Sequence, residues 1–146
     1  MSNDETADII NWDAYAKTKA ELGPGFVRIL SYFREDGVKS VARIEQAMRE
    51  GVTAQLVVPA HTLKGEARQF GADPLAKVAE EIEMTARRAL EGGRFPDELV
   101  ADVVKVRRLF ERTVELFDKE MNPLVQRRPA GGFGRREAVN TSFGRA

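Results

Sequence analysis

A chain of 146 residues, of which 42% are hydrophobic, has enough apolar material for one domain around a single core. It has no cysteine, which excludes disulfides and thiolate metal sites, and no apolar run approaches the roughly 18 residues that cross a bilayer. The formal net charge of zero hides an asymmetry: residues 1–126 carry 18 basic and 22 acidic side chains, whereas residues 127–146 carry five arginines and one glutamate. A mildly acidic folded part argues against nucleic acid as a partner.

The N-terminus begins Met1-Ser2-Asn3-Asp4-Glu5, which is acidic and lacks the basic and then apolar segments of a signal peptide. Together with the absence of cysteine, this favours a cytoplasmic protein with no membrane partner. We expect residues 1–10 to form an N-terminal extension and a short helix to follow over about residues 11–22.

The helical period of apolar residues then dominates as far as about residue 121, and no convincing strand pattern is present. Pro24 suits a helix start, and Gly51 suits its end. The apolar stripe between them comprises Phe26, Ile29, Leu30, Phe33, Val41, Ile44 and Met48. The pair Asp36-Gly37 interrupts this stripe and argues against an unbroken helix.

The next helix is predicted over about residues 53–70, because apolar residues recur there every three or four positions. These residues are Leu56, Ala60, Leu63, Ala67 and Phe70. Pro59 lies inside the segment, where it removes one backbone hydrogen bond and is expected to bend the first turns. Gly71 closes the segment.

Two further helices complete the pattern. Asp73-Pro74 offers an N-cap followed by proline at the first helical position, and Gly92-Gly93 ends that helix. Pro96 opens the last helix, and Asn122-Pro123 stops it. The first stripe is Leu75, Ala79, Ile82, Ala86 and Ala89 or Leu90, and the second is Leu99, Val103, Val106, Phe110, Val114, Phe117 and Met121.

Four amphipathic helices joined by short loops can bury their apolar stripes only against one another. We therefore expect an all-α fold, an antiparallel four-helix bundle over residues 11–124 with a short extra helix at its N-terminus. Residues 125–146 are rich in arginine and glycine. That composition cannot form a core, so we expect a flexible tail.

His61 is the only histidine of the chain, and a helical wheel places it away from the core. With His61 at zero, ~100° per residue puts Arg68 near ~340° and Gly65 near ~40°. Lys64 falls near ~300°, whereas the apolar residues of the same helix span roughly 180° to 260°. The imidazole is therefore predicted to lie on the exposed face, with a lysine, a glycine and an arginine around it.

These neighbours suit phosphoryl chemistry. Gly65 inside a helix costs ~1 kcal/mol relative to alanine, which suggests that a partner approaches the backbone closely there. Lys64 and Arg68 would compensate the nearly doubly negative charge of a phosphoryl group attached to His61. The alternative is that all of these residues belong to an ordinary solvated helix face.

Other chemistries are disfavoured. A metal site would need more ligands than one histidine, and Glu66 lies ~140° from His61 around the wheel. Neither a serine nucleophile elbow nor a glycine-rich phosphate loop is present. If His61 carries out phosphate chemistry, the phosphoryl donor and the metal must come from another protein.

The run Ala60-His61-Thr62-Leu63-Lys64-Gly65, followed by Phe70-Gly71-Ala72 and Leu75-Ala76, resembles the histidine-containing phosphotransfer (HPt) domain of bacterial two-component phosphorelays. The resemblance extends to the helix pattern from about residue 11 to residue 124. Its motif ties a solvent-facing histidine to lysine and glycine at fixed offsets within a four-helix bundle.

The resemblance implies that His61 is the phosphoacceptor, which takes a phosphoryl group from the aspartate of one receiver domain and passes it to another. Lys64 would stabilise the phosphoryl group, and Gly65 would leave room for the receiver to close over His61. We place Arg68 with Gly65 on the partner-binding surface. Such a protein is a phosphocarrier with a covalent intermediate rather than a complete enzyme.

The resemblance also implies response-regulator receiver domains as partners, with a hybrid sensor histidine kinase as a further candidate, and we expect a monomer. No cofactor of its own is expected, and the receiver would supply Mg²⁺. Two residues depart from the family pattern, because Glu66 stands where serine is frequent and Pro59 precedes the histidine. We interpret Glu66 as a solvated residue on the flank of the site.

Two alternatives are open. The first is the dimerisation and phosphoacceptor domain of a sensor kinase. In that domain an acidic residue normally follows the histidine, whereas this chain has Thr62. The alternative from another class is a non-catalytic helical module that binds receivers or other partners without phosphotransfer, because a bundle fold does not fix function.

Overall fold

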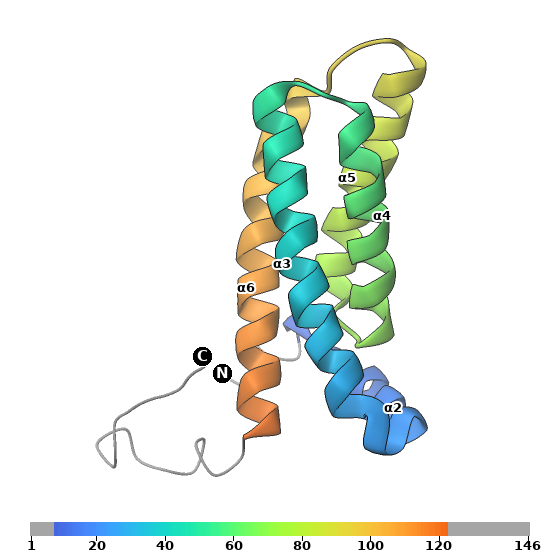
Figure 1. Ribbon diagram of the computed structural model, residues 1–146, viewed down its shortest axis with the longest axis vertical. Coiled ribbons are helices and arrows are strands. Elements are labelled where there is room, and N and C mark those ends of the chain that lie inside the picture. The colour runs from blue at the N-terminus through green and yellow to red at the C-terminus, as the bar shows by residue number, and fades with distance from the viewer. Residues whose placement is uncertain (1–7, 123–146) are drawn as a thin grey trace, which may run out of the picture. The chain divides into compact units, whose positions relative to one another are not determined.

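The computed structural model describes residues 8–122, and no strand is present within this range (Figure 1). Its helices are α2 (Trp12–Leu22), α3 (Phe26–Glu50), α4 (Ala54–Gln69), α5 (Asp73–Glu91) and α6 (Val100–Met121). Short 3-10 turns at Gly23–Gly25 and Asp97–Leu99 precede α3 and α6. The chain divides into two units, residues 1–114 and 115–146, and the packing described below is that of the first unit.

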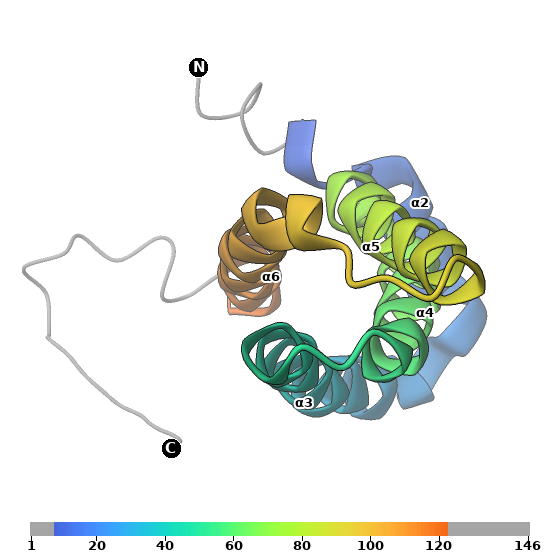
Figure 2. The ribbon, with the colours of Figure 1, turned by 90° about the horizontal axis from the view of Figure 1, so that it is seen from above.

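The long helices α3, α4, α5 and α6, the last as far as Val114, run alternately up and down around one core (Figures 1 and 2). Helix α4 packs against both α3 and α5, and Arg107 of α6 donates from Nη2 to Oε1 of Glu45 on α3 at 2.8 Å. The core is apolar and includes Phe33, Ile44, Leu56, Leu63, Ile82 and Val106, none more than 2% exposed. The predicted all-α, antiparallel four-helix bundle is confirmed.

Helix α3 is continuous, so the pair Asp36-Gly37, which argued against an unbroken helix, does not interrupt it. Gly37 is buried, and a Cβ atom placed there would overlap the ring of Phe110 on α6. The glycine therefore allows two helices to pack closely instead of breaking one of them. The helix ends at Gly51, whose positive φ of 71° provides a left-handed cap.

Helix α4 is also uninterrupted, although Pro59 lies inside it. Proline has no N–H, so the carbonyl of Gln55 loses its intrahelical donor. The ring of Pro59 is buried and contributes to the core. The helix then continues through His61 to Gln69, so the proline costs one hydrogen bond without ending the segment that carries the histidine.

The two later helices begin slightly differently from the prediction. Asp73 is the first residue of α5, and Ala72 occupies the N-cap position that we expected for Asp73. After Pro96, a 3-10 turn over Asp97–Leu99 comes before α6 begins at Val100. The proline signals locate both starts to within a few residues.

A cluster of aromatic rings fixes the end of α4 that follows His61. The rings of Tyr15 and Phe26 are perpendicular, with centroids 5.3 Å apart. The ring of Phe70, which follows α4, lies 5.9 Å from Phe26 and 5.5 Å from Phe33. The pairs of Phe26 with Tyr15 and Phe70 are edge-to-face, and pairs of this kind contribute stability beyond the area they bury. They anchor one face of α4 in the core and leave the opposite face outside.

The short helix α2 is attached to the turn between α4 and α5. The side-chain oxygen of Asn11 caps α2 by accepting from Ala14 N at 3.1 Å, and the backbone N–H of Asn11 donates to Gly71 O at 2.8 Å. The hydroxyl of Thr18 donates to Gln69 O at 2.6 Å. The predicted N-terminal helix thus secures the far end of the histidine helix.

Residues 1–7 and 123–146 lie outside the described part of the chain. The predicted extension over residues 1–10 lies mostly there, and the predicted tail over residues 125–146 lies there entirely, so both stay predictions. Within residues 8–122, no helix is both long enough and apolar enough to span a membrane.

Candidate functional site

His61 lies on the exposed face of α4, as the helical wheel predicts. Its side chain is 61% exposed, whereas Ala60, Leu63 and Ala67 of the same helix are completely buried. The apolar stripe holds α4 against the core and so aims the imidazole outward.

A buried carboxylate from the neighbouring helix contacts the imidazole. Oε2 of Glu83, on α5, lies 3.0 Å from Nδ1 of His61. The side chain of Glu83 is only 3% exposed. A carboxylate buried to this degree needs charged partners, because desolvation strongly disfavours its ionised form.

Three side chains supply that compensation. Lys64 Nζ lies 2.8 Å from Oε1 of Glu83, and Arg87 donates to Oε2 from Nε at 2.9 Å and approaches it with Nη2 at 2.8 Å. Burial by itself raises the pKa of Glu83, but Lys64, Arg87 and His61 outweigh it and lower that pKa to about 2. Glu83 is therefore ionised at neutral pH.

The ionised carboxylate determines which nitrogen of His61 carries a proton. A carboxylate can only accept hydrogen bonds, so Nδ1 must donate to Glu83. In a neutral ring, Nε2 then has no proton and its lone pair is available. This arrangement prepares Nε2 as a nucleophile and leaves Nδ1 held by the protein.

Lys64 does not extend freely from the solvent face. Its side chain is only 15% exposed, because it folds against Glu83. Nζ of Lys64 and Oε1 of Glu83 are at the distance of an ion pair. The lysine thus compensates the negative charge at Oε1 of Glu83.

Arg68 pairs with a residue outside this cluster. Its Nη2 lies 2.7 Å from Oε1 of Glu80, and both side chains are about half exposed. Arg87, which the sequence analysis did not single out, is the arginine that contacts the carboxylate beneath His61. The sequence held a signal for this pair, since Glu83 and Arg87 are four residues apart and Glu83 falls beside the apolar stripe of α5.

Gly65 is exposed, and a Cβ atom placed there would meet nothing within 4 Å. No atom of the protein therefore requires glycine at this position. The open space one turn from His61 is consistent with the predicted close approach of a partner.

Glu66 is not the solvated residue that we expected. It is partly buried, and its Oε1 is inaccessible and has no hydrogen-bond partner among the described residues. Burial raises the pKa of Glu66 to about 7, and the neighbouring carboxyl of Asp36 on α3 adds to this increase. Glu66 consequently belongs to the contact between α3 and α4 rather than to the surface around His61.

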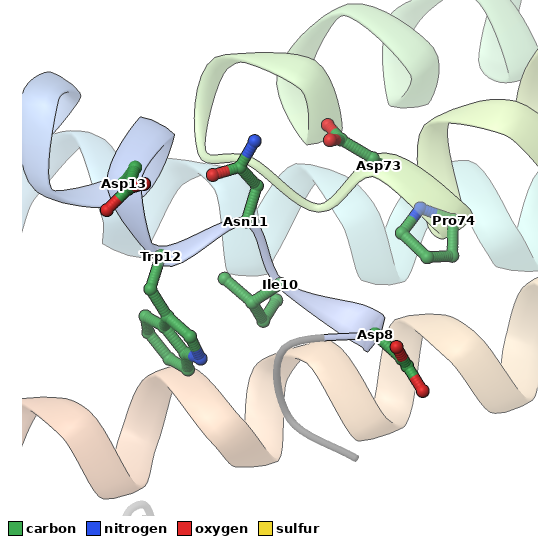
Figure 3. Close-up of a pocket in the computed structure, with 7 residues that line it drawn as sticks. All are labelled: Asp8, Ile10, Asn11, Trp12, Asp13, Asp73 and Pro74. Atoms are coloured by element: carbon green, nitrogen blue, oxygen red, sulfur yellow. The ribbon is translucent and has the colours of Figure 1, made fainter. Parts of the chain in front are cut away.

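A pocket of about 430 Å³ lies elsewhere in the first unit, between the start of α2 and the start of α5 (Figure 3). It is lined by Asp8, Ile10, Asn11, Trp12, Asp13, Asp73 and Pro74. Asp73 is ten residues before Glu83, which corresponds to about 15 Å along α5. The pocket is thus distinct from the histidine site. Within residues 8–122, no group of three or more histidine, aspartate or glutamate side chains could hold a metal ion.

These observations define a class of protein: an all-α bundle that presents one nucleophilic imidazole on an exposed helix, with cations and a buried counter-ion beside it. The Hpt domain model matches residues 28–116, and the chain belongs to the family of histidine-containing phosphotransfer domains. Members of this family are phosphocarriers that act in phosphorelays and interact with response-regulator receiver domains.

A solved structure supports the assignment. Histidine-containing phosphotransfer protein B from Pseudomonas aeruginosa PAO1 is similar to this chain, with 25% sequence identity and a TM-score of 0.68. The match covers 78% of this chain and 95% of that protein. None of the curated proteins compared with the chain matches it.

Proposed function

We propose that the protein accepts a phosphoryl group on Nε2 of His61 from the aspartyl phosphate of one receiver domain and passes it to the aspartate of another. The observation that carries this proposal is the contact of Nδ1 with the ionised, buried carboxylate of Glu83 at 3.0 Å. It gives the exposed imidazole a defined tautomer with a free nucleophilic nitrogen.

The transfer of the phosphoryl group to His61 needs no additional acid or base. The lone pair of Nε2 attacks phosphorus, a P–N bond forms, and the bond from phosphorus to the aspartyl oxygen breaks, so that aspartate leaves as a carboxylate. The proton on Nδ1 of His61 stays in place, and the ring becomes positively charged. Glu83 stabilises this charge because its carboxylate lies against Nδ1.

The neighbouring cations suit the phosphorylated form. Lys64 and Arg87 carry two positive charges, and Glu83 carries one negative charge. The surroundings of His61 thus have a net positive charge, which favours a phosphoryl group that carries nearly two negative charges. We assign phosphoryl stabilisation to Lys64 and assign Gly65 and Arg68 to the surface that meets the receiver.

The remaining components come from partners. The protein acts as a monomeric carrier without a cofactor of its own, and the receiver domain supplies Mg²⁺ together with its phosphorylated aspartate. A hybrid sensor kinase with a receiver domain would be one source of the phosphoryl group. The open space beside Gly65 supports the approach of such a domain to His61.

Incubation with a phosphorylated receiver domain and Mg²⁺ tests the proposal. The protein should acquire label that is labile in acid and stable in base, as a phosphoramidate of histidine is. His61→Ala should abolish the label, while Thr62→Ala, a change at the next exposed position of α4, should retain it. Label that persists in His61→Ala would refute phosphotransfer through His61.

The same experiment distinguishes the alternative function. Receiver binding that is equally strong in wild type and His61→Ala, with no label in either, would identify a helical interaction module without phosphotransfer.

A further inference from the structure

The ion pair between Lys64 and Glu83 has a consequence that goes beyond phosphotransfer itself. We infer that Glu83 and the phosphoryl group on His61 compete for Lys64, so that Glu83 acts as a positioning residue that holds the lysine in the free protein and releases it on phosphorylation. The inference rests on the proposed function of His61 and concerns the regulation of that same site.

The two oxygens of Glu83 have different partners. Oε2 takes the hydrogen bonds from His61 and Arg87, whereas Oε1 faces Lys64 alone among the described residues. Lys64 Nζ is 2.8 Å from Oε1, in an ion pair. The lysine is therefore held by one carboxylate oxygen, and a second anion of greater charge nearby can attract it away from that oxygen.

Lys64 is also within reach of the phosphorylated position. It lies three residues after His61, and residues at this spacing are neighbours on a helix surface. Its long side chain has several rotatable bonds, so Nζ can move between Glu83 and a group attached to the imidazole. The same ammonium group cannot neutralise both anions fully at once.

A change of charge on the ring makes the exchange possible. Removing Lys64 from a buried carboxylate would ordinarily be costly, because it leaves part of the charge on Glu83 uncompensated. Phosphorylation of Nε2 makes the imidazole of His61 positively charged, and its Nδ1–H already contacts Glu83. Glu83 thus has two cationic partners before the reaction, Lys64 and Arg87, and two afterwards, the imidazolium and Arg87.

The competition predicts how the effect of Lys64→Met on phosphorylation of His61 depends on Glu83. In the wild type, part of the benefit of Lys64 to the phosphorylated form is lost because the lysine must leave Glu83. In Glu83→Gln the amide oxygen can still accept from Nδ1, but Lys64 has no charged partner to leave. Lys64→Met should therefore lower the equilibrium fraction of phosphorylated His61 in both backgrounds. The factor of this decrease should be roughly fivefold larger in Glu83→Gln than in the wild type, which is a coupling typical of residues in one ion-pair network.

The experiment measures the phosphotransfer equilibrium with one receiver domain and Mg²⁺ for wild type, Lys64→Met, Glu83→Gln and the double variant. Glu80→Gln is the matched control, because Glu80 pairs with Arg68 and not with Lys64. The factor for Lys64→Met should be the same in Glu80→Gln as in the wild type. Thermal unfolding followed by circular dichroism confirms that each variant is folded.

A spectroscopic measurement separates the competition from a loss of imidazole orientation. Nitrogen-15 NMR of His61 should show Nδ1 protonated in both wild type and Glu83→Gln. The competition is overturned if Lys64→Met lowers the phosphorylated fraction of His61 by an equal or smaller factor in Glu83→Gln than in the wild type. Label on His61 in that case still supports the proposed function. Absence of label on His61 in every variant would instead overturn the proposed function itself.

Discussion

The contact between Nδ1 of His61 and Glu83 is the part of the site that gives a surface histidine a defined chemical state. Most exposed histidines exchange between two neutral tautomers, because water satisfies either nitrogen. Here the acceptor is a carboxylate with a pKa of about 2, lowered by Lys64, Arg87 and His61 against the effect of burial. The reactivity of Nε2 is thus determined by a residue on another helix.

Replacing Glu83 by alanine tests this dependence. Without an acceptor, His61 should populate both neutral tautomers, and the imidazolium formed during transfer should lose its counter-ion. We expect the transfer rate to fall by roughly tenfold or more, the size of effect seen when groups that orient metal-bound histidines are removed. Nitrogen-15 NMR of His61 together with transfer kinetics checks both effects, and an unchanged tautomer ratio in Glu83→Ala would contradict the assignment.

Replacing Gly65 by leucine should increase the stability of the protein and decrease its rate of phosphotransfer. Leucine has a higher helix propensity than glycine and would meet no atom within 4 Å at its Cβ, so the free energy of unfolding should rise by about 0.5–1 kcal/mol. The larger side chain should nevertheless obstruct the receiver and slow transfer strongly. Chemical unfolding and transfer kinetics measure the two effects, and unchanged kinetics would show that no partner approaches this position.

The sequence predicts the exposed side of this site better than its buried side. The face occupied by His61 follows from helical periodicity alone, because only residues of one helix are involved. Glu83 belongs to a different helix, and its contact with His61 depends on how α4 and α5 pack. Helical periodicity also could not show that Lys64 turns inward to Glu83 or that Arg68 pairs with Glu80.

The packing of α3 against α6 depends on a glycine in the middle of a long helix. Gly37 lies where a Cβ would overlap the ring of Phe110. A glycine inside a helix lowers its intrinsic stability, so the close contact with Phe110 must compensate for that loss. Two adjacent features of the sequence, a turn-like dipeptide and an apolar stripe, gave conflicting indications, and tertiary packing resolved them in favour of a continuous helix.

Gly37→Ala should therefore destabilise the protein, although alanine is the better helix former. We expect the free energy of unfolding to fall by about 1–3 kcal/mol, as overpacked core positions do. Gly65→Ala is the matched control, because its Cβ meets no atom within 4 Å and the same substitution should stabilise the protein there. Urea unfolding followed by circular dichroism measures both variants, and stabilisation by Gly37→Ala would show that the contact with Phe110 relaxes easily.

Helix positions were predictable because each helix has a strong apolar period and clear end signals. Gly51 ends α3 with a positive φ, and the prolines near residues 74 and 96 precede or open the next two helices. Pro59 was the harder case, since a proline inside a helix is compatible with either a break or a continuous helix. Its burial in the core, which only the assembled bundle provides, favours the continuous form.

Two glutamates with opposite pKa shifts, Glu66 and Glu83, should contribute to the pH dependence of the stability of the molecule. The pKa of Glu66 rises from 4.5 to about 7, first because of burial and then because of Asp36. Between these pH values the folded state keeps a proton on Glu66 that the unfolded state loses. The contribution of Glu66 to the free energy of unfolding is therefore complete below pH 4.5 and is lost as the pH rises through about 7. The pKa of Glu83 is lowered to about 2, so its contribution is complete above pH 4.5 and is lost as the pH falls through about 2.

These opposite signs predict a free energy of unfolding that is greatest near pH 5 and decreases towards pH 8. Glu66 is only partly buried, so solvent screening limits the decrease to the order of 1 kcal/mol. Glu66→Gln should remove most of the decrease between pH 5 and pH 8, because the amide has no proton to lose. Glu83→Gln should leave that decrease in place and reduce instead the loss of stability below pH 4.5. Urea unfolding across the pH range measures both slopes. If the free energy of unfolding of Glu66→Gln still decreased as much between pH 5 and pH 8, the contact between α3 and α4 would hold Glu66 equally well in its ionised form. Asp36 would then exert no effective repulsion on it.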